Sequence, residues 1–259
     1  MRDGVWKDCG SWHPVGLVEN LIQRRLSSYS LTLSGLENLE LMRGGPCIIA
    51  ANHVQPENRV LEASGFGPDS FVIQDVVRRM GWRLRIVAKY ELDEWQANTI
   101  PAFLHPLAEC LQRKLILMHG DIPVRRNSVR NKTFLRLITR AITNKDAILW
   151  YPTGVWGQDF SPDQEVRPGV AYVAKRFGVP VIPAYLRGCT SWRACQKVDV
   201  VFGEAIHCCE LSRQEVRARV QQEILGCRQR LALSELSPRV AGSPIRETII
   251  DAPIPELEC

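Results

Sequence analysis

The chain has 259 residues, of which 45% are hydrophobic and 24% are charged, and its formal net charge is +5. This composition excludes a chain that is disordered throughout, and the length suits one compact domain with a large core. Basic residues are spread along the sequence, so the charge favours acidic partners such as phosphate-bearing substrates, carrier proteins or anionic lipid surfaces, and nucleic-acid binding has no specific support.

The first predicted element is an amphipathic helix near the N-terminus. From Val15 to Leu26, apolar side chains recur at helical spacing with polar residues between them. Such a helix can pack on the domain or lie in a membrane interface. We assign residues 1–29 to an N-terminal helical segment, residues 30–232 to the main domain, and residues 233–259, which hold four prolines, to an extended tail.

Short apolar runs that predict strands alternate with helical patterns along the main domain. The predicted strands are Leu31–Leu33, Cys47–Ala51, Arg85–Ala88, Lys114–Leu117, Ala147–Trp150, Val179–Tyr185 and Val198–Phe202. Helical patterns are found at Phe134–Thr143, Val170–Phe177 and Gln214–Leu231. This alternation predicts an α/β fold with a mostly parallel central sheet flanked by helices.

Cysteines and apolar segments bear on the cellular compartment. The nine cysteines are odd in number and include no Cys-x-x-Cys pair, so we expect reduced structural thiols. The first eight residues lack the apolar core of a signal peptide, and no stretch approaches the roughly 20 apolar residues that cross a bilayer. The sequence predicts a cytoplasmic protein that would meet lipid only at the membrane surface.

Asn52 and His53 follow the apolar strand Cys47–Ala51, and active sites of open α/β sheets gather at such carboxyl ends of strands. Imidazole titrates near neutral pH, so His53 is suited to deprotonate an acceptor hydroxyl. Asn52 can either shape the turn or polarise a substrate carbonyl. We predict no metal site, since partners at metal-ligand spacing are missing around His105, His119 and His207.

Four segments in chain order resemble the conserved blocks of the glycerolipid acyltransferase superfamily, which includes the lysophosphatidic acid acyltransferases. These segments are Ser34–Leu39 leading to Ile48–His53, then Gly120–Arg126, then Trp150–Val155, and finally Phe177–Pro183. The short stretches Arg167–Gly169 and Val201–Ile206 resemble the family's segments before and after the fourth block. The resemblance covers about residues 30–207 and rests on the ordered set.

The resemblance implies an acyltransferase domain in which His53 is the general base. In that family the histidine takes a proton from an acceptor hydroxyl, which then attacks the thioester carbonyl of acyl-CoA or of an acyl carrier protein. An aspartate fixes the imidazole and stabilises its cation. The family requires no metal or bound cofactor, so the acyl thioester donor is a substrate and no cofactor is expected.

The family's aspartate, in its Asn-His-x4-Asp block, is replaced by Asn58 in this chain. The dipeptide Gln55-Pro56 resembles a helix start. Such a helix would place Glu57 about 100° away from Asn58, and Glu62 on the face of Asn58. Three interpretations stay open: an enzyme that uses Asn58 slowly, one that recruits Glu57 or Glu62, or an inactive substitution.

The second and third blocks imply substrate-binding residues. Arg126 matches an arginine that contacts the acceptor phosphate, and Arg125 stands beside it; adjacent guanidiniums can bind phosphate through paired hydrogen bonds. Thr153 replaces the glutamate of the third block, and Gly154 can let a substrate approach closely. Trp156 can line an acyl channel.

The sequence therefore predicts an acyltransferase of lipid metabolism and phospholipid biosynthesis that acylates a hydroxyl acceptor such as a lysophospholipid. One alternative is an enzyme of specialised metabolism that acylates a non-phospholipid hydroxyl or amine. Another is a catalytically silent protein that binds lipid or an acyl carrier. Peripheral membrane contact is compatible with each.

Overall fold

The computed structural model describes residues 22, 24–55, 57, 67–92, 97–98, 100–125, 131–154, 156–157, 159–191 and 195–236. Seven strands form one sheet in the order β1-β7-β6-β2-β5-β3-β4. They are β1 (Ser30–Ser34), β2 (Cys47–Ala51), β3 (Leu84–Lys89), β4 (Ile122–Val124), β5 (Ala147–Trp150), β6 (Val181–Arg187) and β7 (Lys197–Phe202). All neighbouring strands are parallel except β6 and β7, which confirms the predicted α/β fold with a mostly parallel sheet.

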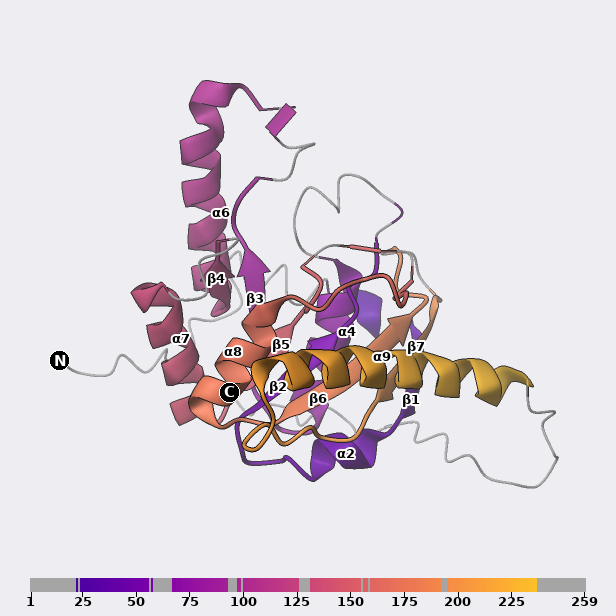
Figure 1. The fold of residues 1–259 in the computed structure, drawn as a ribbon. Helices are drawn as coiled ribbons and strands as arrows, with labels where there is room; N and C mark the ends of the chain where they lie inside the picture. Colours follow the sequence, from indigo (N-terminus) through magenta and orange to yellow (C-terminus); the bar gives the residue numbers. More distant parts are fainter. Residues whose placement is uncertain are drawn as a thin grey trace, which may run out of the picture.

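Helices lie on both sides of the sheet (Figure 1). They are α2 (Leu36–Glu40), α4 (Pro68–Arg79), the 3-10 turn η1 (Ala102–Leu104), α6 (His105–His119), α7 (Lys132–Thr143), α8 (Pro168–Phe177) and α9 (Arg213–Leu236). Side chains of β2 alternate between two cores. Ile49 packs in the core with α4, whereas Ile48 packs in the core with α7, α8 and α9. The central strand is therefore buried on both faces, as a parallel strand covered by helices must be.

The segment Lys114–Leu117 was predicted as a strand, and this prediction is wrong because the segment lies in α6. A short apolar run fits a buried strand and a helix equally well. Pro106 in the first turn starts the helix, and Gly120, with φ at 87°, ends it in the left-handed conformation. The strand of this region is β4, which begins two residues after Gly120 and forms one edge of the sheet.

The predicted segment ends, the cysteines and the apolar segments can also be compared with the described residues. Of the predicted N-terminal helix, residues 22 and 24–26 are described, and they are helical. The last helix, α9, runs to Leu236, four residues beyond the predicted domain boundary. The seven cysteines within the described ranges are free thiols. None of the helices built from described residues is long and apolar enough to cross a membrane.

Candidate active site

Asn52 fixes the carboxyl end of the central strand β2. Its Nδ2 donates to the carbonyl oxygen of Leu186 at 2.9 Å, and its Oδ1 accepts from the amide of Leu186 at 2.7 Å. The side chain is buried, so both of its polar atoms serve to tie β2 to β6. This geometry favours the turn-shaping interpretation of Asn52 over polarisation of a substrate carbonyl.

His53 follows Asn52 and is held against the loop that contains the third block. The amide of Gly157 donates to the carbonyl oxygen of His53 at 3.0 Å, and the amide of Gln55 donates to that of Gly157 at 2.9 Å. These bonds make a short parallel bridge between Val54 and Gly157. The segments after β2 and β5 are thereby joined at the carboxyl edge of the sheet.

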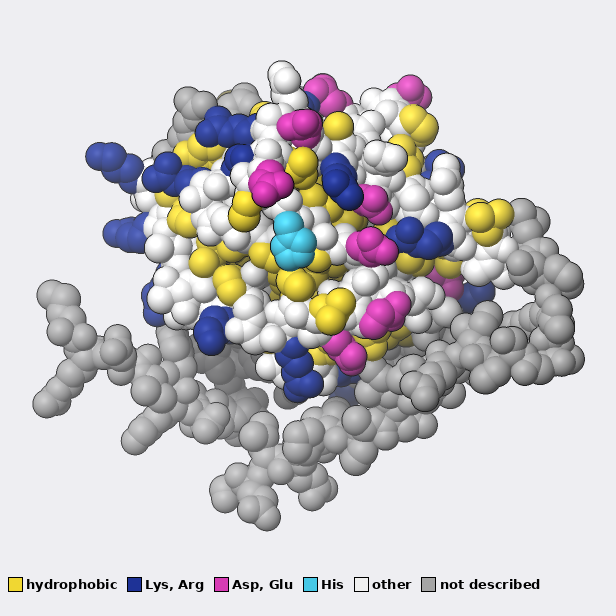
Figure 2. All heavy atoms as spheres, turned by 60° about the horizontal axis from the view of Figure 1, so that its bottom comes forward, with side chains coloured by type: hydrophobic (Ala, Val, Ile, Leu, Met, Phe, Trp, Pro, Cys, Tyr) yellow, Lys and Arg dark blue, Asp and Glu magenta, His cyan; other side chains and the backbone are white. Residues whose placement is uncertain are grey.

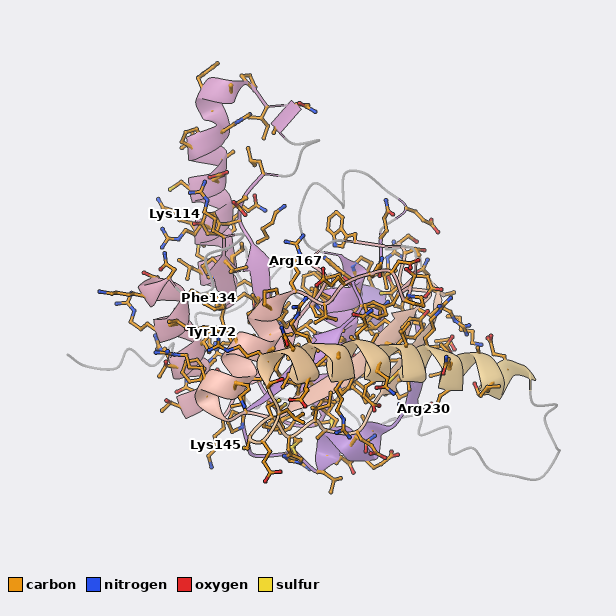
Figure 3. All side chains as sticks on the ribbon, in the orientation of Figure 1. Lys114, Phe134, Lys145, Arg167, Tyr172 and Arg230 are labelled. Atoms are coloured by element: carbon orange, nitrogen blue, oxygen red, sulfur yellow. The ribbon has the colours of Figure 1, made fainter. Side chains whose placement is uncertain are left out.

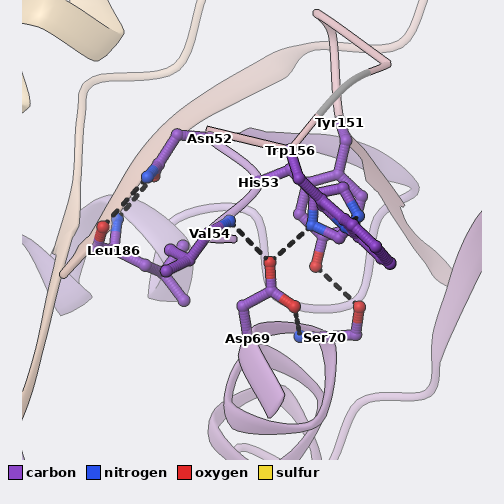
Figure 4. Close-up of polar contacts among 8 residues, drawn as sticks. All are labelled: Asn52, His53, Val54, Asp69, Ser70, Tyr151, Trp156 and Leu186. Carbon is purple, nitrogen blue, oxygen red and sulfur yellow. Dashed lines mark hydrogen bonds and ion pairs between the residues drawn. The ribbon is translucent and has the colours of Figure 1, made fainter. Parts of the chain in front are cut away.

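A buried carboxylate meets the imidazole, and it belongs to Asp69, sixteen residues after His53. His53 Nδ1 lies 2.6 Å from Asp69 Oδ2, which also accepts from the amide of Val54 at 3.0 Å (Figure 4). Asp69 Oδ1 accepts from the amide of Ser70 at 2.8 Å. Asp69 lies in the first turn of α4, where the helix dipole stabilises an anion.

Asp69 determines which nitrogen of the His53 ring carries the proton. A buried carboxylate with a backbone amide on the same oxygen acts as an acceptor, so Nδ1 of His53 carries the proton. Nε2 then holds the lone pair. The arrangement can therefore take up a proton at Nε2 and stabilise the imidazolium that results.

Sequence patterns predict Asn58, Glu57 or Glu62 as the residue that orients His53, and in the structure the contacting carboxylate is that of Asp69. Glu57 turns to Thr190, whose Oγ1 donates to Glu57 Oε1 at 2.8 Å. Asn58 and Glu62 lie outside the described residues. The imidazole of His53 therefore does not need an aspartate at position 58 to orient it, because Asp69 supplies the carboxylate.

A misplaced helix start explains why Asp69 was missed. Gln55 is not helical and Glu57 lies in a bend, and the first described helix after His53 begins at Pro68. The sequence does hold a signal for this start, since Gly67-Pro68-Asp69 combines proline at the first helical position with an acid after it. Apolar residues at helical spacing follow, from Phe71 to Val77.

Two aromatic rings surround the imidazole. Tyr151 stacks on His53 with ring centroids 3.8 Å apart, and its hydroxyl lies 2.7 Å from Ser70 Oγ. Burial and the charge of Asp69 raise the pKa of Tyr151 well above its ordinary value, so its hydroxyl stays neutral. Trp156 meets His53 edge-on, and its indole Nε1 donates to His53 Nε2. The indole therefore occupies the nitrogen that a substrate hydroxyl would approach.

The predicted anion ligands of the second block are only partly described. Arg125 follows β4, and its Nε donates to Glu91 Oε1 at 3.3 Å near the end of β3. Its side chain is about half exposed. Arg126 lies outside the described residues, so its role stays a prediction.

A different arginine, Arg167, packs against the third block. Thr153 is buried, and Gly154 has a φ of 64°. A Cβ at Gly154 would lie 3.5 Å from Cδ and Nε of Arg167, so that side chain packs directly over the glycine. The amide of Arg167 donates to the carbonyl oxygen of Pro152 at 2.9 Å, and Figure 3 labels Arg167 at the N-terminal end of α8. Sequence reasoning used Arg167 only as part of the fold pattern.

Within the described ranges, no three His, Cys, Asp or Glu side chains are grouped so that they could hold a metal ion. By sequence, the chain matches no protein-family model and no curated protein. Its structure is similar to the crystal structure of the 1-acyl-sn-glycerophosphate (LPA) acyltransferase PlsC from Thermotoga maritima, with a TM-score of 0.49 and 20% sequence identity. The match covers 83% of this chain and 79% of that chain. A likeness of this size does not transfer an activity.

Proposed function

We propose that this protein is an acyltransferase that moves an acyl chain from acyl-CoA or an acyl carrier protein to a hydroxyl acceptor, with His53 as general base. The observation that carries the proposal is the buried contact between Asp69 and His53 at the carboxyl end of the central strand. It orients the imidazole and leaves the lone pair on Nε2, where an acceptor hydroxyl would take the place of the Trp156 indole.

The steps follow from that geometry. Once an acceptor hydroxyl replaces the Trp156 indole at Nε2 of His53, Nε2 takes the hydroxyl proton as the hydroxyl oxygen attacks the thioester carbonyl carbon. The tetrahedral intermediate then breaks its carbon–sulfur bond, and the leaving thiolate receives a proton from the imidazolium. Asp69 keeps the required tautomer and stabilises the transient cation. The products are an ester and a free thiol.

Asp69 also bears on the silent-protein alternative. That alternative rested on Asn58, which removes the carboxylate expected by the family pattern. Because Asp69 supplies a carboxylate to the same imidazole nitrogen, the substitution at Asn58 no longer argues against catalysis. The geometry therefore favours an enzyme over a binding protein.

For the acceptor we favour a lysophospholipid of the 1-acylglycerol-3-phosphate type, as the resemblance implies. A guanidinium beside the third block supports an anionic substrate, since the Arg167 side chain packs over Gly154 and forms no described ion pair. Arg125 and Arg126 stay proposals for the same role. Thr153, where the family has glutamate, supports the alternative acceptors, which are non-phospholipid hydroxyls or amines.

The test measures thiol release from acyl-CoA and acyl-carrier donors of several chain lengths, with lysophosphatidic acid and unrelated hydroxyl and amine acceptors. We expect acceptor-dependent release by the native protein, an acylated product detected by mass spectrometry, and loss of both in His53→Gln. Release that is equal in the native protein and in this variant would exclude His53 as the base. Binding of donors without any product would instead identify the silent binder.

A further inference from the structure

One arm of the molecule carries most of its exposed apolar surface. Of nine large hydrophobic side chains that are exposed among the described residues, seven lie in η1 and α6. They are Phe103, Leu104, Leu107, Leu111, Leu115, Leu117 and Met118. Figure 1 shows α6 standing out from the body of the protein beside the edge of the sheet. An apolar surface gathered in this way marks an interaction site.

The exposed leucines form a continuous face of the helix. Leu104, Leu107, Leu111 and Leu115 recur at intervals of three and four residues, which places them on one side of a helix. In α6 the one buried residue is Ile116, on the opposite side, where the helix packs against β4. We call these four leucines and Phe103 the leucine face. Its side chains are turned away from the described core.

Cations lie near the leucine face, on α6 itself and on α7 at the same edge of the sheet. Lys114 lies among the exposed residues of α6, and Figure 3 shows it on the side turned away from the sheet. The neighbouring helix α7 packs on the same edge strand, β4, and exposes Lys132, Arg136 and Arg140. Figure 2 shows Lys and Arg side chains along the left edge, the side on which α7 lies in Figure 1, with Asp and Glu nearer the middle of that face.

Acidic residues do not offset this charge. Between residues 101 and 145, the described acids are Glu109 and Asp121, and Asp121 is buried with its Oδ2 at 2.6 Å from His119 Nδ1. The edge of the sheet at β4, on which both α6 and α7 pack, therefore combines an apolar stripe with exposed cations. This combination is typical of helices that lie in the interface of an anionic membrane.

The leucine face reaches the end of the sheet at which His53 lies. Strands β2, β5, β3 and β4 are parallel, and α6 leads back to the start of β4, so Phe103 and Leu104 lie toward the carboxyl edge. Three strand spacings separate β2 from β4, or roughly 15 Å. The helix itself spans about 22 Å. A surface that held α6 would thus lie close to the candidate active site.

The geometry points to docking of this protein on an anionic lipid bilayer through the leucine face, with Lys114 and the cations of α7 against lipid phosphates. This inference does not depend on acyl transfer by His53. Charge decides between lipid and a second copy of the chain, because two copies facing each other here would bring their cations together, whereas an anionic bilayer neutralises them. The apolar side chains then enter the interfacial region and leave water.

The experiment is flotation of the full chain with vesicles of phosphatidylcholine, with and without phosphatidylglycerol, at low and high salt. We expect binding to the anionic vesicles that weakens with salt. The double variant Leu107→Glu/Leu111→Glu should bind at least about tenfold more weakly, because it places two charges in the interfacial region. The matched control is Leu41→Glu/Leu233→Glu, which changes two exposed leucines elsewhere and should bind as the native protein does.

A second variant isolates the charge. Arg136→Glu/Arg140→Glu should lower binding to anionic vesicles severalfold at low salt and change little at high salt. Equal binding by the two leucine variants would overturn the inference, as would no binding of the native protein to anionic vesicles. A native dimer that Leu107→Glu/Leu111→Glu dissociates, without vesicle binding, would identify a second copy as the occupant.

Measuring acyl transfer to a short-chain, water-soluble acceptor distinguishes a failure of membrane docking from a failure of the proposed function. The variant Leu107→Glu/Leu111→Glu should retain that activity and lose activity toward an acceptor embedded in anionic vesicles. If no acceptor is acylated, the proposed function fails while the vesicle-binding result stands by itself.

Discussion

Two histidine–aspartate pairs in this protein share nearly the same local geometry. His53 lies 2.6 Å from Asp69, and His119 lies 2.6 Å from Asp121, in both cases through Nδ1. The histidine side chains are 13% and 14% exposed, and both aspartates are almost fully buried. Distance and burial therefore do not distinguish a candidate base from a structural pair.

Their positions in the sheet do distinguish them. His53 follows the carboxyl end of β2, and its partner comes from the start of a separate helix. His119 ends α6 just before β4, at the amino edge of the parallel strands, and Asp121 Oδ1 accepts from the amide of Ile86 at 2.8 Å. This second pair ties β3 to β4. Ligands of open parallel sheets bind at the carboxyl edge, which supports the proposal that the first pair is the catalytic one.

The largest expected effect separates the two histidines. His53→Gln should lower kcat/KM by at least about 10³-fold, because it removes the general base. His119→Gln should leave kcat/KM within about twofold and cost about 1–3 kcal/mol of unfolding free energy, because the buried Asp121 carboxylate loses one of its partners. Urea denaturation and the thiol-release assay measure both quantities. Similar loss of activity in the two variants would remove the distinction between the pairs.

The aspartates give the second test. Asp69→Asn should lower kcat by about 10²–10⁴-fold, since the amide no longer fixes the tautomer or stabilises the imidazolium. Asp121→Asn should leave kcat unchanged. Asn58→Asp is an informative companion, because Asp69 already holds Nδ1 of His53 and the new acid should not raise activity. A gain in Asn58→Asp that compensates for Asp69→Asn would return the orienting role to residue 58.

The fold was predictable because its central strands are buried on both faces. Cys47–Ala51, Ala147–Trp150 and Val181–Arg187 form β2, β5 and β6, and uninterrupted apolar runs of this length are typical of parallel strands. The same signal failed at Lys114–Leu117, where the apolar run belongs to α6. Propensity and periodicity cannot separate a four-residue strand from one turn of helix, so tertiary packing decides.

Of the two residues in the His53–Asp69 pair, His53 alone was predictable from the sequence. His53 could be found because it directly follows a buried strand, and that relation is local in the sequence. Its partner could not be found by counting along one presumed helix, since Asp69 is brought back by the fold from a helix that begins at Pro68. The contact with Trp156 also joins residues far apart in sequence. Local patterns locate strand ends, whereas contacts between segments require the fold.

Two tryptophans extend the comparison to smaller effects. Trp156→Phe removes the indole donor from Nε2 of His53, and with one hydrogen bond worth about 1 kcal/mol we expect kcat/KM to rise about fivefold. The control is Trp82, which lines a cavity of about 460 Å³ together with His119. Among the described residues, the buried Nε1 of Trp82 has no hydrogen-bond partner. Trp82→Phe should leave activity unchanged. Lower activity in Trp156→Phe would mean that the indole assists the reaction.

The smallest expected effect concerns the aromatic ring that contacts each histidine. His119 meets Phe71 edge-on, whereas His53 stacks on Tyr151, whose pKa is raised by burial and by the charge of Asp69. A raised pKa means that the folded protein keeps the phenolic proton after the unfolded chain has lost it. Stability from this group is therefore fully present below about pH 10 and falls by about 1.4 kcal/mol per pH unit above it.

Tyr151→Phe isolates this dependence, because phenylalanine can keep the stacked ring. At pH 8 the variant should lose about 0.5–1.5 kcal/mol, the value of one hydrogen bond to Ser70. Above pH 10 the difference should shrink and then reverse as the native protein loses stability. Burial also raises the pKa of Tyr29 and Tyr185, but both remain in the variant, so the difference between the two urea denaturation curves reports Tyr151 alone. Parallel stability curves from pH 8 to pH 11 would show that the Tyr151 hydroxyl ionises as easily in the folded protein as in the unfolded chain.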